Sequence, residues 1–499
     1  MSQQLLDFVS IQLKKESKIA LYVQLYDHLQ ELIISGRLSY GYLLPPVRKL
    51  ATVLGANPGT VVSAYKLLEQ NGYIFSRAGS GSYVAEITGS KEDENQVLSS
   101  DPELEVIPSV TTTLPKNCID FATVMPPPDL LPIDDFKEIL IEVLDRDKGN
   151  AFSYQESQGF SPLREAISTY LKEHGIKAQA DNVQIISGAQ QGIDIVAKSL
   201  LNFGDYVFTE NPTYPGAIAA FRSRGAKIVE INMEDDGIDI QDLEAKIKCF
   251  RPKLIYVMAN IQNPTGYSYS LVKRNRLIGL ARRYNAIILE DDYISELDFS
   301  DQPLAPLKAL DRDHRVIYLK SFSKIFMPGL RLAFLLMPPQ MVAQVLTVKH
   351  HSDISTSGLT QRAFDLYLRK GIWQKHIAAV RRIYLERYQT TLATVEQFLP
   401  PTVTCHRPRG GLTCWLALPE GVSAKKVAAV AEKQGLLLVA GTAFFPRLAP
   451  DRFIRLSFAV VCSEQIRQGI KLLGKIISEI AISSCNSRCP DKEIQCQGI

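Results

Sequence analysis

The stretch Val316-Ile317-Tyr318-Leu319-Lys320-Ser321-Phe322-Ser323-Lys324 passes from an apolar run into a polar segment. Its first four residues are β-branched, aromatic or aliphatic, so they predict a short buried β-strand. That strand delivers Lys324 into a loop beside two serines. Such a lysine is either an ordinary surface charge or a nucleophilic amine that forms a Schiff base with an aldehyde cofactor. The choice depends on what else the chain brings to the same place.

Other apolar runs of similar length alternate with helical segments from residue 119 onward, which predicts a wound α/β sheet. The runs lie at 183–187, 206–210, 254–259, 287–290 and 316–319. Each is followed at once by a polar or glycine-bearing cluster, at 188–192, 211–214, 263–266, 291–293 and 321–324. Ligands of open α/β sheets bind outside the carboxyl ends of the strands. The five clusters therefore predict one shared pocket.

The chemistry of these clusters suits a pyridine cofactor that carries a phosphate. Backbone N–H groups at Ala189 and Gln190 open a helix after a glycine and could hold a phosphate, and Arg331 could clamp it. Asp291 would keep a pyridine nitrogen protonated. Further hydrogen bonds to a phenolic oxygen could come from Asn263 and Tyr293, and a stacking ring from Tyr214. Singly, Asp291 is also explained as a helix cap and 263–266 as a turn; together the clusters favour the cofactor pocket.

This set of residues resembles the fold-type I aminotransferases, which use pyridoxal 5′-phosphate, over residues 119–480. The resemblance implies a large α/β domain, here 118–480, whose smaller C-terminal α+β subdomain covers about 375–480. It also implies that Lys324 carries the internal aldimine, that Asp291 pairs with the pyridinium, and that Arg455 grips a substrate α-carboxylate. The phosphate would be held by Ser321, Arg331 and the turn at Ala189 and Gln190, with Tyr154 reaching the phosphate of a partner subunit.

The first ninety residues predict a separate small domain. Apolar periodicity indicates helices over 19–35, 47–54 and from Asn57-Pro58 to 72, followed by strands at 73–77 and 82–86. Three helices and a hairpin are typical of a winged helix-turn-helix, whose third helix would lie in the major groove of DNA. The alternative is a small helical packing or dimerisation domain.

Detailed motifs in this region resemble the GntR family of bacterial repressors over residues 15–87. They include Leu44-Pro45-Pro46-Val47-Arg48-Lys49-Leu50-Ala51 and Gly79-Ser80-Gly81-Ser82-Tyr83-Val84. The resemblance implies that Arg48, Asn57, Thr60 and Gly81 contact phosphates or bases of double-stranded operator DNA. Pro58 departs from the family, because many members place a basic or polar reader there.

Size and composition leave room for both domains. A chain of 499 residues exceeds the size of a single core, and a net charge of +3 does not by itself argue for nucleic acid. We expect no membrane span and a cytoplasmic location. Residues 88–117 predict a flexible linker. The tail at 481–499 carries Cys485, Cys489 and Cys496, which would be free thiols or, less in keeping with their spacing, a metal site.

Together the two domains resemble the MocR-type, GabR-like subfamily of GntR regulators. We expect a homodimer in which each DNA-binding head packs on the other subunit's large domain, head-to-tail. The protein would sense an amine, an amino acid or pyridoxal phosphate itself through Schiff-base chemistry at Lys324. The rival hypothesis is a working aminotransferase with an appended DNA-binding head. The residues that would select an effector, at 121–128, Gly216 and 444–445, do not identify it.

Overall fold

The computed structural model describes residues 13, 20–34, 37–38, 41–70, 73–77, 81–85, 118–447 and 450–486. The chain forms two compact units, Met1–Asp101 and Pro102–Ile499. The predicted linker at 88–117 lies outside the described residues.

The N-terminal unit contains the predicted helices and hairpin. Its elements are α1 (Leu21–Ile34), α2 (Val47–Leu54), α3 (Pro58–Gln70), β1 (Ile74–Arg77) and β2 (Gly81–Val84). The two strands pair antiparallel, with Ile74 opposite Val84 and Arg77 opposite Gly81. This is the winged helix-turn-helix arrangement expected from the sequence.

One small core holds this unit together. Leu25 and Leu29 of α1 are completely buried, as are Val61 and Leu68 of α3. Gly55 ends α2 with φ of +58°, a left-handed conformation that glycine adopts without steric cost. The chain can therefore reverse between α2 and α3 within three residues, which fixes the angle between the two helices of the motif.

The larger unit is built on an eight-stranded sheet in the order β4-β11-β10-β9-β8-β5-β6-β7. All five predicted strands are present and run parallel to one another. The antiparallel strand β11 lies between β4 and β10, and β7 adds an antiparallel edge. The bounds are β4 (Val183–Ile186), β5 (Tyr206–Asn211), β6 (Lys227–Glu234), β7 (Gly237–Ile238), β8 (Leu254–Val257), β9 (Ile287–Asp292), β10 (Val316–Ser321) and β11 (Ala333–Leu336). Strands β6, β7 and β11 are additions to the five that the sequence predicts.

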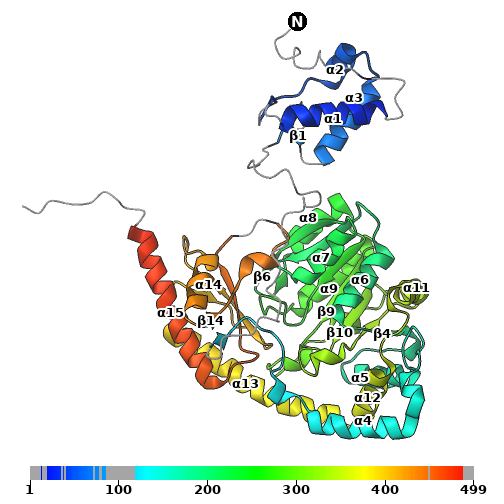
Figure 1. Ribbon diagram of the computed structural model, residues 1–499, viewed down its shortest axis with the longest axis vertical. Helices are drawn as coiled ribbons and strands as arrows, with labels where there is room; N and C mark the ends of the chain where they lie inside the picture. The colour runs from blue at the N-terminus through cyan, green and yellow to red at the C-terminus, as the bar shows by residue number, and fades with distance from the viewer. Residues whose placement is uncertain are drawn as a thin grey trace, which may run out of the picture. The chain divides into compact units, whose positions relative to one another are not determined.

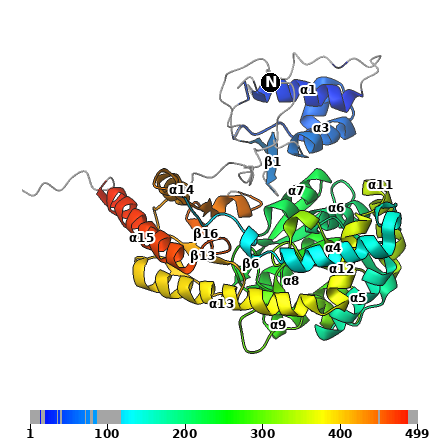
Figure 2. The same ribbon diagram turned by 60° about the horizontal axis from the view of Figure 1, so that its bottom comes forward.

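Helices cover both faces of this sheet (Figures 1 and 2). Apolar residues of α6 (Ala189–Leu200), α7 (Pro215–Ser223) and α11 (Val342–Asp353) share one cluster with the sheet. Those of α8 (Ile240–Phe250), α9 (Leu271–Arg283) and α10 (Leu307–Leu310) share a second cluster on the opposite face. Because strands β8, β9 and β10 are buried on both sides, their sequences are continuous apolar runs.

The smaller part of this unit is α+β, as expected. Its sheet has the order β12-β13-β16-β15. The strands are β12 (Thr404–Cys405), β13 (Thr413–Ala417), β15 (Val439–Ala440) and β16 (Phe453–Ser457), with helices α14 (Ala424–Lys433) and α15 (Ser463–Asn486). A second, two-stranded pair joins β3 (Ile119–Asp120) to β14 (Leu436–Leu437) in parallel. Residues from the beginning of the domain thus lie with its C-terminal part.

The remaining helices are α4 (Ile133–Asp147), α5 (Ser161–Glu173), α12 (Gly358–Arg369) and the long α13 (Ile372–Phe398). Helix α15 continues to Asn486, so the beginning of the segment 481–499, expected to be a polar tail, is helical. An apolar helix face explains this continuation, since Ile477 and Ile480 are buried. Residues 487–499 lie outside the described residues. None of the helices in the described part of the chain is long and apolar enough to cross a membrane.

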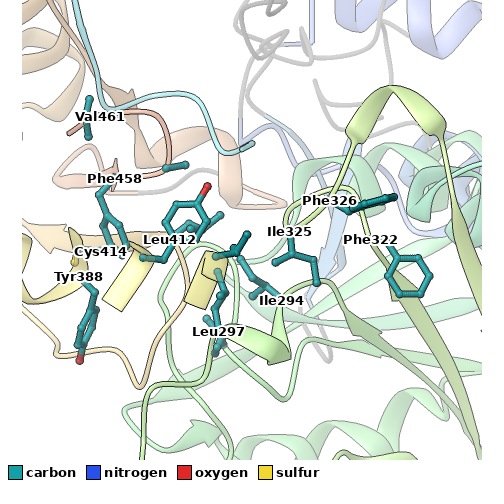
Figure 3. Packing of buried hydrophobic residues seen from close by; sticks show 14 of the residues in the cluster. Ile294, Leu297, Phe322, Ile325, Phe326, Tyr388, Leu412, Cys414, Phe458 and Val461 are labelled. Atoms are coloured by element: carbon teal, nitrogen blue, oxygen red, sulfur yellow. The ribbon is translucent and has the colours of Figure 1, made fainter. Parts of the chain in front are cut away.

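A single apolar cluster joins the two parts of the larger unit. Figure 3 shows Phe322, Ile325 and Phe326, which follow β10, in the same cluster as residues of the smaller part. Ile294 and Leu297 lie between Ile325 and Leu412 in this view. Phe322 and Phe326 bracket Lys324 in sequence and both are buried. The loop that carries the lysine is therefore anchored on both sides by core packing.

Candidate functional site

The carboxyl ends of the parallel strands bring the predicted clusters to one edge of the sheet. Strand β9 ends at Asp292 and β10 ends at Ser321, and these two strands are direct neighbours. Asn211 ends β5, and α6 begins at Ala189 shortly after β4. The topology thus places the carboxyl ends of these parallel strands at one edge of the sheet, where ligands of such sheets bind.

Asp291 is a buried carboxyl with one oxygen available. The Tyr256 hydroxyl donates a 2.7 Å hydrogen bond to Oδ2 of Asp291. Oδ1 is shielded from solvent and has no hydrogen-bond partner among the described residues. Burial, together with the nearby charge of Asp292, raises the pKa of Asp291 to about 7. A cation or N–H donor placed against Oδ1 would satisfy this oxygen and favour the carboxylate.

Asp292, the next residue, is already fully engaged elsewhere. Its Oδ1 lies 3.1 Å from Nζ of Lys320, and its Oδ2 accepts a 2.7 Å hydrogen bond from the Tyr318 hydroxyl. Burial alone would raise the pKa of Asp292, but Lys320 and these hydrogen bonds outweigh it and hold that pKa at about 2. Lys320 is completely buried and also pairs with Glu296 at 2.6 Å. Of the two aspartates, Asp291 is therefore the one free to bind a ligand.

Lys324 is a half-buried amine in a positively charged setting. Its Nζ donates a 2.7 Å hydrogen bond to the carbonyl oxygen of Val124. Burial, reinforced by the charges of Arg455 and Arg331, lowers the pKa of Lys324 to about 8. A lysine with such a pKa has an appreciable unprotonated fraction near neutrality, which is what a nucleophilic amine requires.

Arg331, Ser321 and the first N–H groups of α6 are the groups predicted to hold a phosphate, and together they are called the anion cradle. Gly188 has φ of +94°, which favours glycine, and a Cβ there would lie 2.2 Å from Nη2 of Arg331, so glycine also permits this position of the guanidinium. Arg331 reaches the carbonyl of Ser187 at 3.4 Å, and Ser321 is 4 % exposed at the end of β10. The first N–H groups of a helix have no intrahelical partner. Ala189 and Gln190 supply these groups, while the Gln190 side chain donates to the Gly216 carbonyl at 2.8 Å.

The remaining predicted pocket residues are Asn263, Tyr293 and Tyr214. Oδ1 of Asn263 is shielded from solvent and has no partner among the described residues. Burial raises the pKa of Tyr293 and that of Tyr214. Charges of Asp291, Arg331 and Arg455 all act on the Tyr214 hydroxyl, which places Tyr214 among the other site residues. A Cβ on Gly216 would lie 2.5 Å from the Tyr214 ring, so glycine permits this ring position.

Arg455 is a buried cation without a paired carboxylate among the described residues. It is 8 % exposed, its Nη2 donates to the Ala122 carbonyl at 2.8 Å, and its Nε has no partner among those residues. The guanidinium lies 5.0 Å from the Phe444 ring centroid. Burial lowers the pKa of Arg455 to about 10. Arg455 is still a cation near neutral pH, and an incoming carboxylate would raise its pKa again and fill the open donor.

Tyr154 does not join this group within the described subunit. Its side chain is 85 % exposed, and Phe152 beside it is 70 % exposed. The tyrosine is therefore available to a second copy of the chain, as the expected role in a partner's pocket would require.

Three groups at the site were not anticipated from the sequence. Tyr256 holds Asp291, the Val124 carbonyl holds Lys324, and the Phe444 ring lies under Arg455. Tyr256 lies within the apolar run of a strand. The two-residue alternation of side chains along this strand and along the strand of Asp291 was the only sequence signal that could have placed the two residues on one face of the sheet. The partners of Lys324 and Arg455 come from distant segments that no spacing rule connects.

Family comparisons agree with these two units. Residues 118–473 match the aminotransferase class I and II family, and residues 21–84 match the bacterial regulatory proteins of the gntR family. The chain belongs to the aminotransferase class I and II family. It carries a GntR-type helix-turn-helix domain in front, the architecture of the MocR-type regulators.

Individual relatives fall into two groups. The aromatic-amino-acid aminotransferase 1 of Thermococcus litoralis is 34% identical over 72% of this chain and 88% of its own length. The probable rhizopine catabolism regulatory protein MocR of Rhizobium meliloti is 29% identical over 92% of this chain and 94% of its own. Among solved structures, the α-aminoadipate aminotransferase LysN of Thermus thermophilus matches with a TM-score of 0.70 and 32% identity, covering 74% of this chain and 94% of LysN. That structure holds N-(5′-phosphopyridoxyl)-L-leucine.

Membership in this family implies pyridoxal 5′-phosphate as the cofactor, and the residues fit it. The unpaired Oδ1 of Asp291 suits a ring N–H, and the cradle of Arg331, Ser321 and α6 suits a phosphate. The half-buried amine of Lys324 suits the aldehyde of the cofactor.

The residues predicted to face DNA lie in the N-terminal unit. Arg48, Asn57 and Gly81 are exposed, and Thr60 is half-buried. Asn57 caps α3, since its Oδ1 accepts a 2.8 Å hydrogen bond from the Gly59 N–H. Gly81 has φ of +113° at the start of β2, and a Cβ there would lie 2.8 Å from Leu43. The conformation of the hairpin thus favours glycine at position 81, independently of any contact between Gly81 and DNA.

Proposed function

We propose that this protein is a DNA-binding transcriptional regulator whose aminotransferase-like domain senses a small amine or amino acid through Schiff-base chemistry at Lys324. The observation that carries the proposal is a lysine whose pKa is lowered by burial and by the charges of two guanidinium groups, Arg455 and Arg331. An amino acid offers an amine and a carboxylate, and the chain offers Lys324 and Arg455 for them. The N-terminal helix-turn-helix supplies the output.

Specific residues would hold the cofactor. Arg331, Ser321 and the N–H groups of Ala189 and Gln190 would bind its phosphate, and Asp291 would bind its ring nitrogen. Tyr214 would stack on the ring, while Asn263 and Tyr293 would bind its phenolic oxygen. When bound, pyridoxal phosphate supplies an aldehyde that primary amines attack and a ring that withdraws electrons.

The chain's own residues would then discriminate between ligands. Arg455 would bind the carboxylate of an amino acid, because its Nε is open and it is shielded from water. Lys324 would compete with the incoming amine for the same carbon, so effector binding would free the lysine side chain. Ligand contacts that differ between two domain arrangements would shift their populations and hence DNA affinity.

We further propose that the protein works as a homodimer, head-to-tail, in the cytoplasm. The exposed Tyr154 supports this proposal, because it would complete the phosphate site of a second subunit. Arg48, Asn57, Thr60 and Gly81 are the proposed DNA contacts.

The test uses the full-length holoprotein and DNA fragments that it selects from genomic DNA. Amines and amino acids are titrated while both the visible absorbance of the bound cofactor and the fluorescence anisotropy of labelled DNA are recorded. A ligand that shifts both signals in the wild type, and neither in Lys324→Ala, supports the proposal. Ligand-induced changes in DNA affinity that persist in Lys324→Ala would contradict it. A response to pyridoxal phosphate alone would instead identify the cofactor as the effector.

A working aminotransferase is the second candidate, because the proposed site contains the lysine, the aspartate and both arginines of a complete enzyme. Multiple turnovers with an amino donor and a 2-oxo acid acceptor would favour this candidate. One conversion per bound cofactor, followed by arrest, would favour the regulator.

A further inference from the structure

A cavity of about 450 Å³ lies between the large sheet and the small sheet, apart from the residues of the proposed cofactor site. The large-sheet side contributes Asn211, Asp235 and Tyr267, and the small-sheet side contributes Trp415, Phe445 and Phe453. None of the residues proposed to hold the cofactor or the effector carboxylate lines it, although Phe445 belongs to the segment 444–445 that is expected to select the effector. A volume of this size is within the usual range for small-molecule sites.

One wall of the cavity is a stack of aromatic rings. The rings of Trp415 and Phe453 are parallel within 11° at a centroid distance of 5.2 Å, and Phe445 and Phe453 stack at 5.9 Å. Aromatic faces carry partial negative charge and attract cations and flat rings. This wall therefore favours a planar ligand, and a positively charged one above a neutral one.

The charge of the opposite wall agrees with a cation. Asp235 is the only acidic or basic side chain among the described residues that line the cavity, apart from His406, whose Nδ1 lies 3.8 Å from Asp235 Oδ1. The carboxylate is 79% exposed, so ordinary solvent screening applies in the empty cavity. The Tyr267 hydroxyl also hydrogen-bonds to Asp235. A carboxylate has about four lone-pair sites, so a further N–H donor can be accepted.

A second acceptor in the lining has no donor. Oδ1 of Asn211, at the carboxyl end of β5, is shielded from solvent and has no hydrogen-bond partner among the described residues. Because this oxygen is closed to water, a ligand N–H reaches it only after the Asn211 side chain rotates, and the bond would then remove an unsatisfied group that costs about 1–3 kcal/mol. The lining thus combines an aromatic wall and a carboxylate, with an unpaired acceptor behind its surface.

We propose that this cavity is a second ligand site, which takes a small planar cation bearing N–H groups, such as an aromatic amidinium or a protonated aromatic amine. The site is separate from Lys324 and does not depend on the cofactor. Its aromatic wall nevertheless adjoins Arg455, the proposed contact of the effector carboxylate. Trp415 is the strand partner of Arg455, and Phe444 contacts both side chains. A ligand here would therefore act on the same sheet that carries Arg455.

Benzamidinium is a suitable probe, because it is flat, cationic and rich in N–H donors but has no nucleophilic primary amine. Binding is followed by calorimetry and by the fluorescence of Trp415, one of two tryptophans in the chain. We expect saturable binding to the full-length protein, unchanged within twofold in Lys324→Ala. Asp235→Asn should weaken binding about tenfold, since it removes a charge-assisted contact. Ala417 also lines the cavity, and Ala417→Phe should abolish binding by filling it.

Asp236→Asn is the matched control, because Asp236 lies in the same turn but pairs with Lys273 at 2.6 Å and does not line the cavity. It should bind benzamidinium like the wild type. The proposal is overturned if the wild type shows no saturable binding, if Asp235→Asn and Ala417→Phe bind normally, or if Lys324→Ala alone loses binding. That last outcome would assign the probe to the cofactor site, whereas failure of the sensing proposal would leave the benzamidinium result unaffected.

Discussion

The Tyr256 hydroxyl lies 2.7 Å from Oδ2 of Asp291 and donates a hydrogen bond to it, while Oδ1 of the same carboxyl has no partner among the described residues. Tyr256 is completely buried on β8, and its ring meets Phe221 edge-on at 5.7 Å. The tyrosine therefore fixes the rotation of the aspartate and leaves one oxygen for a ligand. The geometry assigns Tyr256 to positioning, not to direct contact with a substrate.

Tyr256→Phe should weaken cofactor binding without unfolding the protein. The substitution keeps the ring and removes one hydrogen bond to a buried carboxyl, a loss of about 1.5–3 kcal/mol. We expect the dissociation constant for pyridoxal phosphate to rise roughly tenfold or more, measured by absorbance titration of the apoprotein. The pH at which the cofactor spectrum changes should also move, since the pKa of Asp291 responds to this bond.

Tyr269→Phe is the matched control for this experiment. Tyr269 is also completely buried and donates a 2.8 Å hydrogen bond to the buried carboxylate of Glu210. It should lower stability to a similar degree and leave the cofactor spectrum unchanged. Equal spectral effects of both substitutions would contradict the special role of Tyr256.

Lys324 should make cofactor loading depend on pH. The neutral amine is the reactive form, and a pKa of about 8 means that its fraction rises as the pH increases through 8. At pH 7 about a tenth of Lys324 would be neutral, against roughly 0.04% for an ordinary lysine. The second-order rate of loading, measured by stopped-flow absorbance, should therefore climb from pH 6.5 and level off above pH 8.5. A rate that keeps rising tenfold per unit to pH 10 would contradict the lowered pKa.

The sequence was sufficient for the strands that deliver the site, for a physical reason. Strands β8, β9 and β10 are buried on both faces, so each is an uninterrupted apolar run that ends in a polar cluster. Strand β6 is only partly buried, with Lys227 and Asn232 exposed, so its sequence contains no continuous apolar run. Strand β11 was not predicted. It runs antiparallel to its neighbours, and no polar or glycine-bearing cluster of the kind that follows the predicted strands comes after it.

The choice between Asp291 and Asp292 illustrates what the sequence could not decide by spacing. Adjacent strand residues point to opposite faces. The side chains of Lys320 and Tyr318 reach Asp292 from the neighbouring strand and occupy it, which leaves Asp291, on the other face, free for a ligand. The aromatic wall at Trp415 and Phe453 was likewise invisible, because its members come from three segments that meet only in the folded chain.

Arg48→Ala should weaken binding to operator and non-operator DNA alike. Arg48 is exposed on the first turn of α2, which suits a phosphate contact. Loss of one such contact should reduce the slope of log K against log salt by about 0.9. Anisotropy titrations at several salt concentrations measure this slope.

Arg282→Ala serves as the control. Arg282 is an exposed arginine of the larger unit that pairs with Asp313, and its loss should leave the slope unchanged. A loss confined to operator DNA would instead indicate base recognition by Arg48.

Arg455→Met should remove the preference for amino acids over simple amines. The buried guanidinium has an open Nε and no paired carboxylate among the described residues, so a ligand carboxylate would bind it in a water-poor setting. Charge-assisted hydrogen bonds of this kind contribute about 1.5–3 kcal/mol, which predicts a loss of roughly tenfold to a hundredfold in amino-acid affinity. The decarboxylated amine of the same side chain lacks that contact, and its affinity should be unchanged. Spectral titration of the holoprotein measures the affinity for both ligands.

Arg452→Met, which alters an arginine just before β16, is the control and should change neither affinity. If Arg455→Met weakened the amine and the amino acid equally, Arg455 would be supporting the pocket and not reading the carboxylate.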